Sequence, residues 1–207
     1  AAPGAGTVVH FHGNGETIGD NVDLAAHLAA RGLGVALVEY RGYGVSRDEP
    51  RPTEDGLYAD AEAALDGLRD EGVASDEVVL WGTSIGSGVA TEMARRGRGR
   101  ALVLVTPYTS IPDVVRRLVP FVPVDLIVTD RFDSRSKAAS ITVPTLIVHG
   151  TDDEIIPYDM GRTLSSAIRG ARLLTVEGGH HNDLFARDGA RLMAAIVDHA
   201  RGVGAAP

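Results

Sequence analysis

The chain has 207 residues, of which 44% are hydrophobic and 23% charged, and its formal net charge is -8. A single domain of this length can bury a sufficient core. The negative charge argues against nucleic acid as a partner, because such binding needs a basic surface. The absence of cysteine excludes disulfides, thiolate metal sites and cysteine nucleophiles. No run reaches the ~20 apolar residues of a membrane-spanning helix. We expect a cytoplasmic protein, unless a segment ahead of Ala1 directs it elsewhere.

Short apolar, β-branched runs alternate with longer amphipathic stretches along the chain. The apolar runs predict buried parallel strands at residues 7–12, 35–40, 77–81, 101–106, 145–149 and 172–176. The stretches between them predict helices at residues 20–31, 56–71, 85–96, 157–169 and 186–201. This alternation is typical of a doubly wound, mostly parallel sheet with helices on both faces. We therefore predict one α/β domain over residues 1–207, with residues 202–207 as a flexible tail.

Residues 107–143 break the alternation with a long, proline-rich stretch that is only partly helical in pattern. Loops of this length in compact domains are usually lids or binding elements. We expect a short lid here and call residues 107–143 the lid segment.

A G-x-S-x-G motif, Gly82-Thr83-Ser84-Ile85-Gly86, follows the strand predicted at 77–81 and precedes a predicted helix. This pattern is typical of the nucleophile elbow, where a serine sits on a strained turn between strand and helix. The two glycines leave room for the backbone to double back, and the helix directs its N-terminal dipole at the reacting carbonyl. Ser84 is therefore the candidate nucleophile, and the backbone N–H of Ile85, the next residue, is a candidate oxyanion donor.

Two further polar loops follow predicted strands. Asp152 and Asp153 come after the strand at 145–149, and His180 and His181 come after the strand at 172–176. In the α/β-hydrolase fold the catalytic residues follow the chain order serine, acid, histidine. The imidazole would take the serine proton, and the carboxylate would orient the imidazole. The loop order leaves open which aspartate and which histidine take these roles.

Several motifs of the chain resemble the small α/β-hydrolase-domain serine hydrolases, a group that includes eukaryotic protein depalmitoylases and many bacterial esterases. These motifs are His12-Gly13-Asn14-Gly15, Tyr40-Arg41-Gly42-Tyr43-Gly44-Val45-Ser46, the elbow, Asp130-Arg131-Phe132-Asp133, His149-Gly150-Thr151-Asp152-Asp153 and His181-Asn182-Asp183. The resemblance extends from about Thr7 to Arg201. It implies Asp153 as the acid, His181 as the base and the backbone of Asn14 as the second oxyanion donor. Glu39 stands where that family usually has aspartate.

Two other interpretations are weaker. The glycines of residues 13–19, with Glu39 after the next strand, resemble a dinucleotide fingerprint whose third glycine is one place late. A short-chain dehydrogenase would need a tyrosine four residues before a lysine, but the only lysine, Lys137, has Asp133 there. His10 and His12 could share a strand face as a metal pair, but no further ligands accompany them. We expect no metal and no cofactor.

The sequence therefore predicts a serine hydrolase that acts on a small-molecule carboxylic ester or thioester. Phe121 and Leu126 in the lid segment are expected to line an acyl pocket above Ser84. The alternatives are a peptidase of the same fold and a binding module that has kept the scaffold without catalysis. The sequence carries no signal for the oligomeric state.

Overall fold

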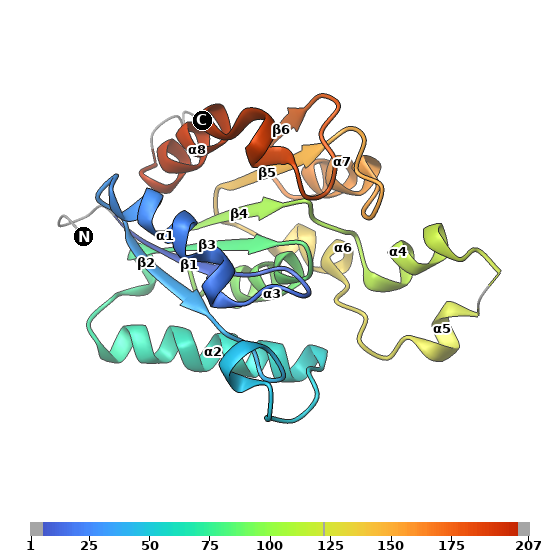
Figure 1. The fold of residues 1–207 in the computed structure, drawn as a ribbon, viewed down its shortest axis with the longest axis horizontal. Coiled ribbons are helices and arrows are strands. Elements are labelled where there is room, and N and C mark those ends of the chain that lie inside the picture. The colour runs from blue at the N-terminus through green and yellow to red at the C-terminus, as the bar shows by residue number, and fades with distance from the viewer. Residues whose placement is uncertain (1–5, 122, 203–207) are drawn as a thin grey trace.

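The computed structural model describes residues 6–121 and 123–202, and it has one six-stranded parallel sheet with the strand order β2-β1-β3-β4-β5-β6 (Figure 1). The strands are β1 (Thr7–Phe11), β2 (Gly34–Val38), β3 (Val78–Thr83), β4 (Ala101–Val105), β5 (Thr145–Gly150) and β6 (Arg172–Val176). Every pairing between neighbouring strands is parallel. The predicted doubly wound sheet is therefore confirmed.

Helices connect the strands as the sequence predicts. The α-helices are α1 (Val22–Ala29), α2 (Glu54–Asp70), α3 (Ile85–Arg95), α4 (Ile111–Leu118), α5 (Val124–Ile127), α6 (Ser134–Lys137), α7 (Tyr158–Ala167) and α8 (Leu184–Ala200). Short 3-10 turns are η1 (Ile18–Asn21), η2 (Gly44–Ser46), η3 (Ser75–Glu77) and η4 (Ala138–Ser140). The helix expected over residues 20–31 is shorter than predicted, because its first turn is the separate turn η1.

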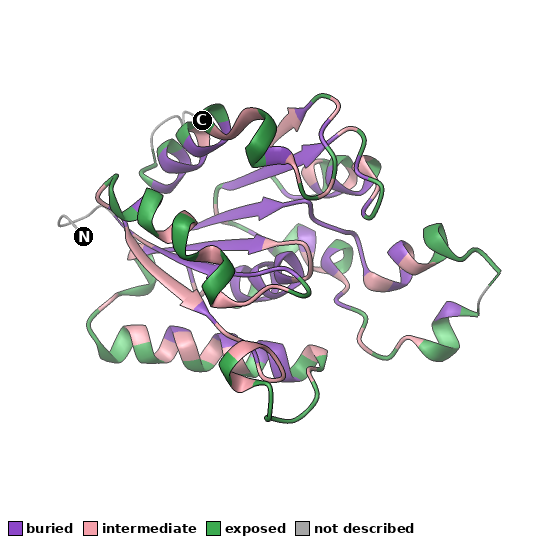
Figure 2. Cartoon of the chain, viewed as in Figure 1, coloured by how far each residue is buried: buried purple, intermediate pink, exposed green. Residues whose placement is uncertain are grey.

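The helices form two layers. In Figure 1, α1 and α8 cover one face of the sheet, and α2 and α3 cover the other. Side chains of β3 alternate between the layers, since Leu80 joins the core beneath α2, α3 and α7 while Val79 and Trp81 join the core beneath α1 and α8. Figure 2 shows the central strands β3 and β4 almost entirely in the colour of buried residues. Near-continuous apolar strands are the expected consequence of two covered faces.

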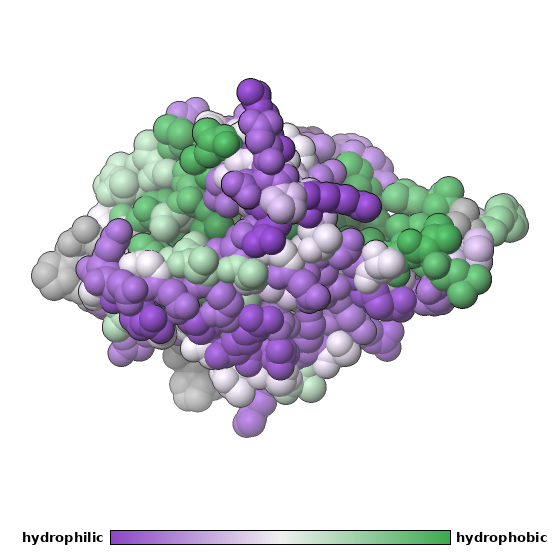
Figure 3. All heavy atoms as spheres, turned by 90° about the horizontal axis from the view of Figure 1, so that it is seen from below, coloured by the Kyte–Doolittle hydropathy of each residue, from purple (hydrophilic) through white to green (hydrophobic). Residues whose placement is uncertain are grey.

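The lid segment extends from the body of the molecule as α4, a connecting stretch and α5 (Figure 1). Helix α4 stops at Leu118, two residues before Pro120, in agreement with the restriction that proline places on the residue before it. Apolar residues gather on this projection, at the right of Figure 3. No helix within the described residues is long and apolar enough to cross a membrane. Of the predicted tail, residues 203–207 lie outside the described part of the chain.

Candidate active site

Ser84 lies on a sharp turn between β3 and α3. Its backbone has φ 51° and ψ -118°, a conformation that residues with a side chain rarely adopt. Such strain costs about 1–3 kcal/mol and persists only where the surroundings impose it. A Cβ on Gly82 would collide with the backbone of Gly86, and one on Gly86 would collide with the carbonyl oxygens of Phe11 and His12. Both motif glycines are therefore required for the close approach of α3 to β3 and β1.

The side chains of Ser84, His181 and Asp153 form a continuous hydrogen-bonded row. His181 Nε2 lies 3.1 Å from Ser84 Oγ, and His181 Nδ1 lies 2.8 Å and 3.0 Å from the two carboxylate oxygens of Asp153. Because a carboxylate only accepts, Nδ1 carries the proton and Nε2 is free to accept the serine hydroxyl proton. The three residues come from the ends of β3, β5 and β6, far apart in the sequence. The row has the geometry that a serine nucleophile, a base and an orienting acid require.

Asp153 is buried but well supplied with donors. Its Oδ1 accepts from the backbone N–H groups of Ile155 at 3.0 Å and Ile156 at 2.8 Å. Its Oδ2 lies 3.2 Å from Nε2 of His149, a ring with no exposed surface. Burial alone would raise the pKa of Asp153, but the hydrogen bonds from His149, His181 and Ile156 outweigh it and hold that pKa well below the ordinary value. Asp153 is therefore a carboxylate throughout the range in which proteins usually work.

The neighbouring aspartate and histidine have other partners. Asp152 is exposed and accepts from the Thr151 hydroxyl at 3.0 Å. The His180 ring is about half exposed, and its Nδ1 lies 3.1 Å from the Glu154 carboxylate. Of the alternatives that the loop order left open, the structure brings His181 to Ser84 and Asp153 to His181, whereas Asp152 and His180 have other partners.

Asn14 and Ile85, the two candidate oxyanion donors, border the same cavity beside Ser84. The loop of Asn14 lies next to the start of α3, because Gly86 packs against the carbonyls that precede it. The Asn14 side chain accepts a hydrogen bond from the Tyr43 hydroxyl at 2.8 Å, and the Ile85 carbonyl accepts one from the Tyr108 hydroxyl at 3.1 Å. Both segments are therefore held by an aromatic hydroxyl.

Two cavities meet at Ser84. The larger, of about 850 Å³, lies between α1 and α8 and is lined by His181, Trp81 and Phe185 among others. Its outer part carries charged side chains, including Asp23 and Arg31. The smaller, of about 270 Å³, lies on the side of α2 and α4. Its main apolar lining residues are Leu57, Tyr108, Ile111, Val114, Phe132 and Ile156.

The structure does not bring Phe121 and Leu126 to either cavity, which corrects the expectation that they line an acyl pocket. Phe121 is 99% exposed and Leu126 is 84% exposed. Pro120 and Pro123 interrupt the segment between α4 and α5, and both side chains lie at the surface of this projection. The lid segment contributes to the smaller cavity through α4, with Ile111 and Val114, and through Phe132.

The residues behind the two weaker interpretations have structural partners. The His10 ring is buried, lies 3.3 Å from the Thr83 hydroxyl and packs edge-on against Trp81. The His12 ring lies 3.0 Å from the Glu39 carboxylate, so Glu39 already has a partner within the protein. Among the residues that the structure describes, no three histidine, aspartate or glutamate side chains are grouped to hold a metal ion.

His149 and Phe132 belong to motifs of the sequence that predict no role for either residue. His149 contacts the far side of Asp153, and Phe132 forms a wall of the smaller cavity. Tyr108, which supports the Ile85 carbonyl, carries no sequence signal for this role. The signal for His149 is its position at the end of an apolar strand, four residues before the acid.

Comparisons with known proteins agree with the fold of this chain. A family model described as serine aminopeptidase, S33 matches residues 2–132, and one described as TAP-like protein matches residues 127–196. An uncharacterized protein of Mycobacterium tuberculosis is 34% identical over 191 residues, which cover 91% of this chain and 67% of that protein. Human alpha/beta hydrolase domain-containing protein 17B is 34% identical over 186 residues, which cover 86% of this chain and 61% of that protein.

Solved structures of the same fold include a monoacylglycerol lipase from Paleococcus ferrophilus, with a TM-score of 0.73, 19% identity, and coverage of 96% of this chain and 95% of that one. The esterase RhEst1 from Rhodococcus also has a TM-score of 0.73, with 20% identity and coverage of 97% and 92%. At these identities the likeness concerns the fold. The chain belongs to the α/β-hydrolase family, which indicates a hydrolytic enzyme.

Proposed function

We propose that this protein is a serine hydrolase that cleaves carboxylic esters or thioesters through an acyl intermediate on Ser84. The observation that supports this most directly is the row of contacts from Ser84 Oγ to His181 Nε2 at 3.1 Å and from His181 Nδ1 to Asp153 at 2.8 Å. A serine hydroxyl is a weak nucleophile until a neighbouring base accepts its proton. His181 supplies that base, and Asp153 stabilises the imidazolium that forms.

In the proposed reaction, Ser84 Oγ attacks the carbonyl carbon of the ester while His181 takes the hydroxyl proton. The backbone N–H groups of Ile85 and Asn14 stabilise the oxyanion of the tetrahedral intermediate. When this intermediate collapses, the bond to the leaving group breaks and His181 returns its proton to the departing oxygen or sulfur. A water molecule, deprotonated by the same imidazole, then hydrolyses the acyl-serine.

The two cavities can be assigned to the two halves of the substrate. The leaving group must lie beside His181, because that imidazole protonates it. His181 lines the larger cavity and not the smaller one, whereas Ile85 lines the smaller one alone. We therefore place the leaving group in the larger cavity and the acyl chain in the smaller, apolar one. Its volume of about 270 Å³ equals that of about nine water-sized groups at roughly 30 Å³ each, which suits a medium-length acyl chain.

Two solved structures of this fold are described as a monoacylglycerol lipase and an esterase, which supports ester cleavage. The family model described as serine aminopeptidase favours a second candidate, an aminopeptidase. Such an enzyme would hold a free ammonium group on the acyl side. Asp130 is the one acidic residue among those that line the smaller cavity, and its Oδ1 already accepts from the backbone N–H of Glu54 at 2.7 Å. The lining therefore suits an apolar acyl group better than an amino acid.

Covalent labelling tests the proposal. A fluorophosphonate probe should modify the wild-type protein at Ser84, should fail to label Ser84→Ala, and should label His181→Ala much more slowly. Hydrolysis of p-nitrophenyl octanoate compared with leucine p-nitroanilide separates the two candidates, and we expect the ester to be the better substrate. Labelling that persists in Ser84→Ala would refute Ser84 as nucleophile, and a preference for the anilide would favour the aminopeptidase.

A further inference from the structure

Phe132 has an unusual backbone conformation beside the candidate site. Its φ is 42°, in the left-handed region that bulky side chains avoid. The side chain is buried and forms a wall of the smaller cavity, where it packs edge-on against Tyr58 with the ring centroids 5.5 Å apart. It also occupies space that a Cβ on Gly88 would need. A strained aromatic residue of this kind keeps its place only when the surrounding structure holds it.

The carboxylate of Glu54, at the first position of α2, holds the backbone of Phe132. Its Oε2 accepts from the N–H of Arg131 at 2.7 Å and from the N–H of Phe132 at 2.9 Å. In return, the Glu54 N–H donates to Asp130 Oδ1 at 2.7 Å. Three hydrogen bonds thus join the start of α2 to residues 130–132 of the lid segment, 76 to 78 positions later in the chain.

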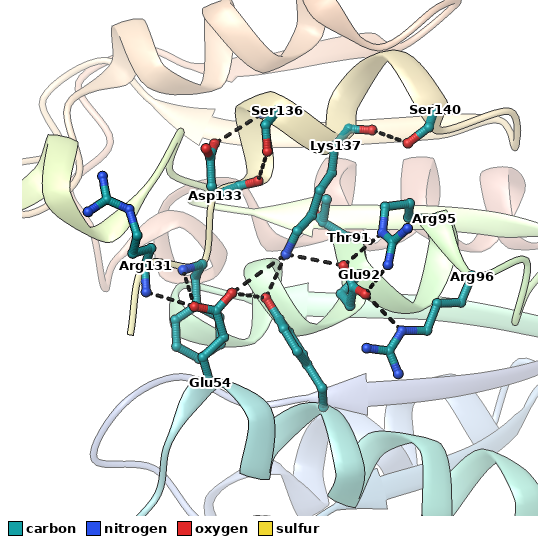
Figure 4. Close-up of polar contacts among 12 residues, drawn as sticks. Glu54, Thr91, Glu92, Arg95, Arg96, Arg131, Asp133, Ser136, Lys137 and Ser140 are labelled. Carbon is teal, nitrogen blue, oxygen red and sulfur yellow. Dashed lines mark hydrogen bonds and ion pairs between the residues drawn. The ribbon is translucent and has the colours of Figure 1, made fainter. Parts of the chain in front are cut away.

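Glu54 is itself fixed by a partly buried polar network, which Figure 4 shows between α2, α3 and the lid segment. The Tyr58 hydroxyl donates to Glu54 Oε1 at 2.7 Å. The Nζ of Lys137 donates to the Tyr58 hydroxyl at 2.7 Å and lies 3.1 Å from Glu92 and 3.7 Å from Glu54. Glu92 is only 3% exposed. Burial would raise the pKa of Glu92, but Arg95, Arg96 and Lys137 lower it to about 2, so this end of the network stays negatively charged.

We propose that Glu54 is a positioning residue that keeps Phe132 in its left-handed conformation, as the wall that limits acyl-chain length in the smaller cavity. The inference rests on the proposed function, since it takes this cavity as the acyl site. Glu54 touches no reacting atom; it acts through the backbone of Phe132. When its carboxylate is removed, the N–H groups of Arg131 and Phe132 lose the oxygen that accepts from both of them. The strained backbone then relaxes, and the cavity opens to longer chains.

The test compares Glu54→Ala, Glu54→Gln and Glu62→Ala. Glu62 is a suitable control because it also lies on α2 and forms ion pairs, with Arg96 and Arg98, but its carboxylate accepts no hydrogen bond from residues 130–132. The first readout is the ratio of kcat/KM for decanoyl and butyryl p-nitrophenyl esters. The second is amide hydrogen exchange at Arg131 and Phe132, which does not depend on activity.

We expect Glu54→Ala to raise the decanoyl-to-butyryl ratio about fivefold, since small changes in an apolar pocket alter discrimination by such factors. Glu54→Gln keeps one acceptor oxygen and should fall between it and the wild type, and Glu62→Ala should leave the ratio unchanged. The amides of Arg131 and Phe132 should exchange faster in Glu54→Ala, less so in Glu54→Gln, and at the wild-type rate in Glu62→Ala. An unchanged ratio, or the same change in Glu62→Ala, would overturn the proposal.

The exchange measurement also separates this inference from the proposed function. If the wild type hydrolysed no ester, the proposed function would fail, and faster exchange at Arg131 and Phe132 in Glu54→Ala would still support the positioning role. If those amides remained protected without the Glu54 carboxylate, the positioning role would be overturned whatever the activity. Glu54→Gln serves for both readouts should Glu54→Ala fail to fold.

Discussion

Asp153 is contacted by a second imidazole, because Nε2 of His149 lies 3.2 Å from Oδ2 of Asp153. The same nitrogen lies 2.9 Å from the carbonyl oxygen of Ile156. Both neighbours accept hydrogen bonds, so Nε2 of His149 carries a proton. The carboxylate of Asp153 thus lies between His181, which faces Ser84, and His149, which faces the core. His149 limits the positions that Asp153 can take and so indirectly fixes the orientation of His181.

Replacing His149 with phenylalanine should impair both stability and activity. A hydrogen bond to a charged group contributes about 1.5–3 kcal/mol, so we expect a loss of unfolding free energy of about 2 kcal/mol. With this donor gone, burial raises the pKa of Asp153, and its carboxylate is less firmly placed. We expect kcat/KM to fall on the order of tenfold at neutral pH, equivalent to about 1.4 kcal/mol of barrier.

His199→Phe is the matched control for this prediction. His199 is also buried and contacts a backbone carbonyl, that of Leu102 at 3.1 Å, but it is remote from the candidate site. Urea unfolding and ester kinetics should show a loss of stability in both variants and a loss of kcat/KM in His149→Phe alone. A similar loss of kcat/KM in both would contradict a specific role for His149.

Mild acid should destabilise the protein through His10. Burial, with a smaller contribution from the nearby His12, lowers the pKa of His10 from 6.5 to about 3. Between these two values the unfolded chain binds a proton at residue 10 that the folded chain does not. The unfolding free energy therefore falls as the pH drops through this window, by about 2 kcal/mol between pH 7 and pH 5. His199, whose pKa burial also lowers, adds to the same trend.

Thermal unfolding at pH 7 and pH 5 measures this effect. His10→Gln keeps a polar group beside Thr83 and removes the titration, so its Tm should fall less between the two pH values than that of the wild type. His27→Gln is the control, because His27 is exposed on α1. If Tm fell by the same amount between pH 7 and pH 5 in the wild type and both variants, the burial of His10 would not be the cause of the acid destabilisation.

The exposure of Phe121 and Leu126 predicts that they have little effect on hydrolysis of soluble esters. Phe121→Ser and Leu126→Ser should keep kcat/KM within about twofold of the wild type, in line with substitutions on the surface. Val114 lines the smaller cavity instead. Val114→Phe should reduce the space there and lower kcat/KM for octanoyl esters relative to butyryl esters. A strong effect at Phe121 and none at Val114 would show that the lid segment closes over Ser84 during turnover.

The assignment of the larger cavity predicts which variants discriminate between leaving groups. Ala190 lies on α8 at this cavity, and tryptophan there would fill part of the space. Ala190→Trp should raise KM for esters with a bulky alcohol several-fold and leave small methyl esters unaffected, because only the bulky group extends between α1 and α8. Val114→Phe should show the opposite selectivity. If Ala190→Trp instead raised KM for esters with a long acyl chain and not for those with a bulky alcohol, the assignment of the two cavities would be reversed.

The sequence predicted the sheet, the position of Ser84, and an aspartate and a histidine in loops at the same edge, because these features follow local patterns. Buried parallel strands are near-continuous apolar runs, and loops after neighbouring strands meet at one edge of the sheet. Which aspartate and which histidine point at Ser84 depends on side-chain directions in two loops. Loop order alone could not decide this, and the family resemblance supplied the choice.

Other features could not be predicted from local patterns. Glu54 resembles any acidic residue in the first turn of a helix, and its partner Arg131 lies 77 residues away. The left-handed backbone of Phe132 has no sequence signal, because phenylalanine does not favour it. Hydrophobicity suggested that Phe121 faces the site. Whether an apolar lid residue packs inward depends on how Pro120 and Pro123 direct the chain, which is a property of the folded lid segment.

The most direct test of the central claim is hydrolysis of a p-nitrophenyl ester series, from acetyl to decanoyl, by the wild type and Ser84→Ala in parallel. We predict that the wild type hydrolyses the series with an optimum at medium chain length. Ser84→Ala should lose at least about 10³-fold in kcat, as expected when a serine nucleophile is removed. Equal rates in the two proteins would contradict a mechanism through acyl-Ser84.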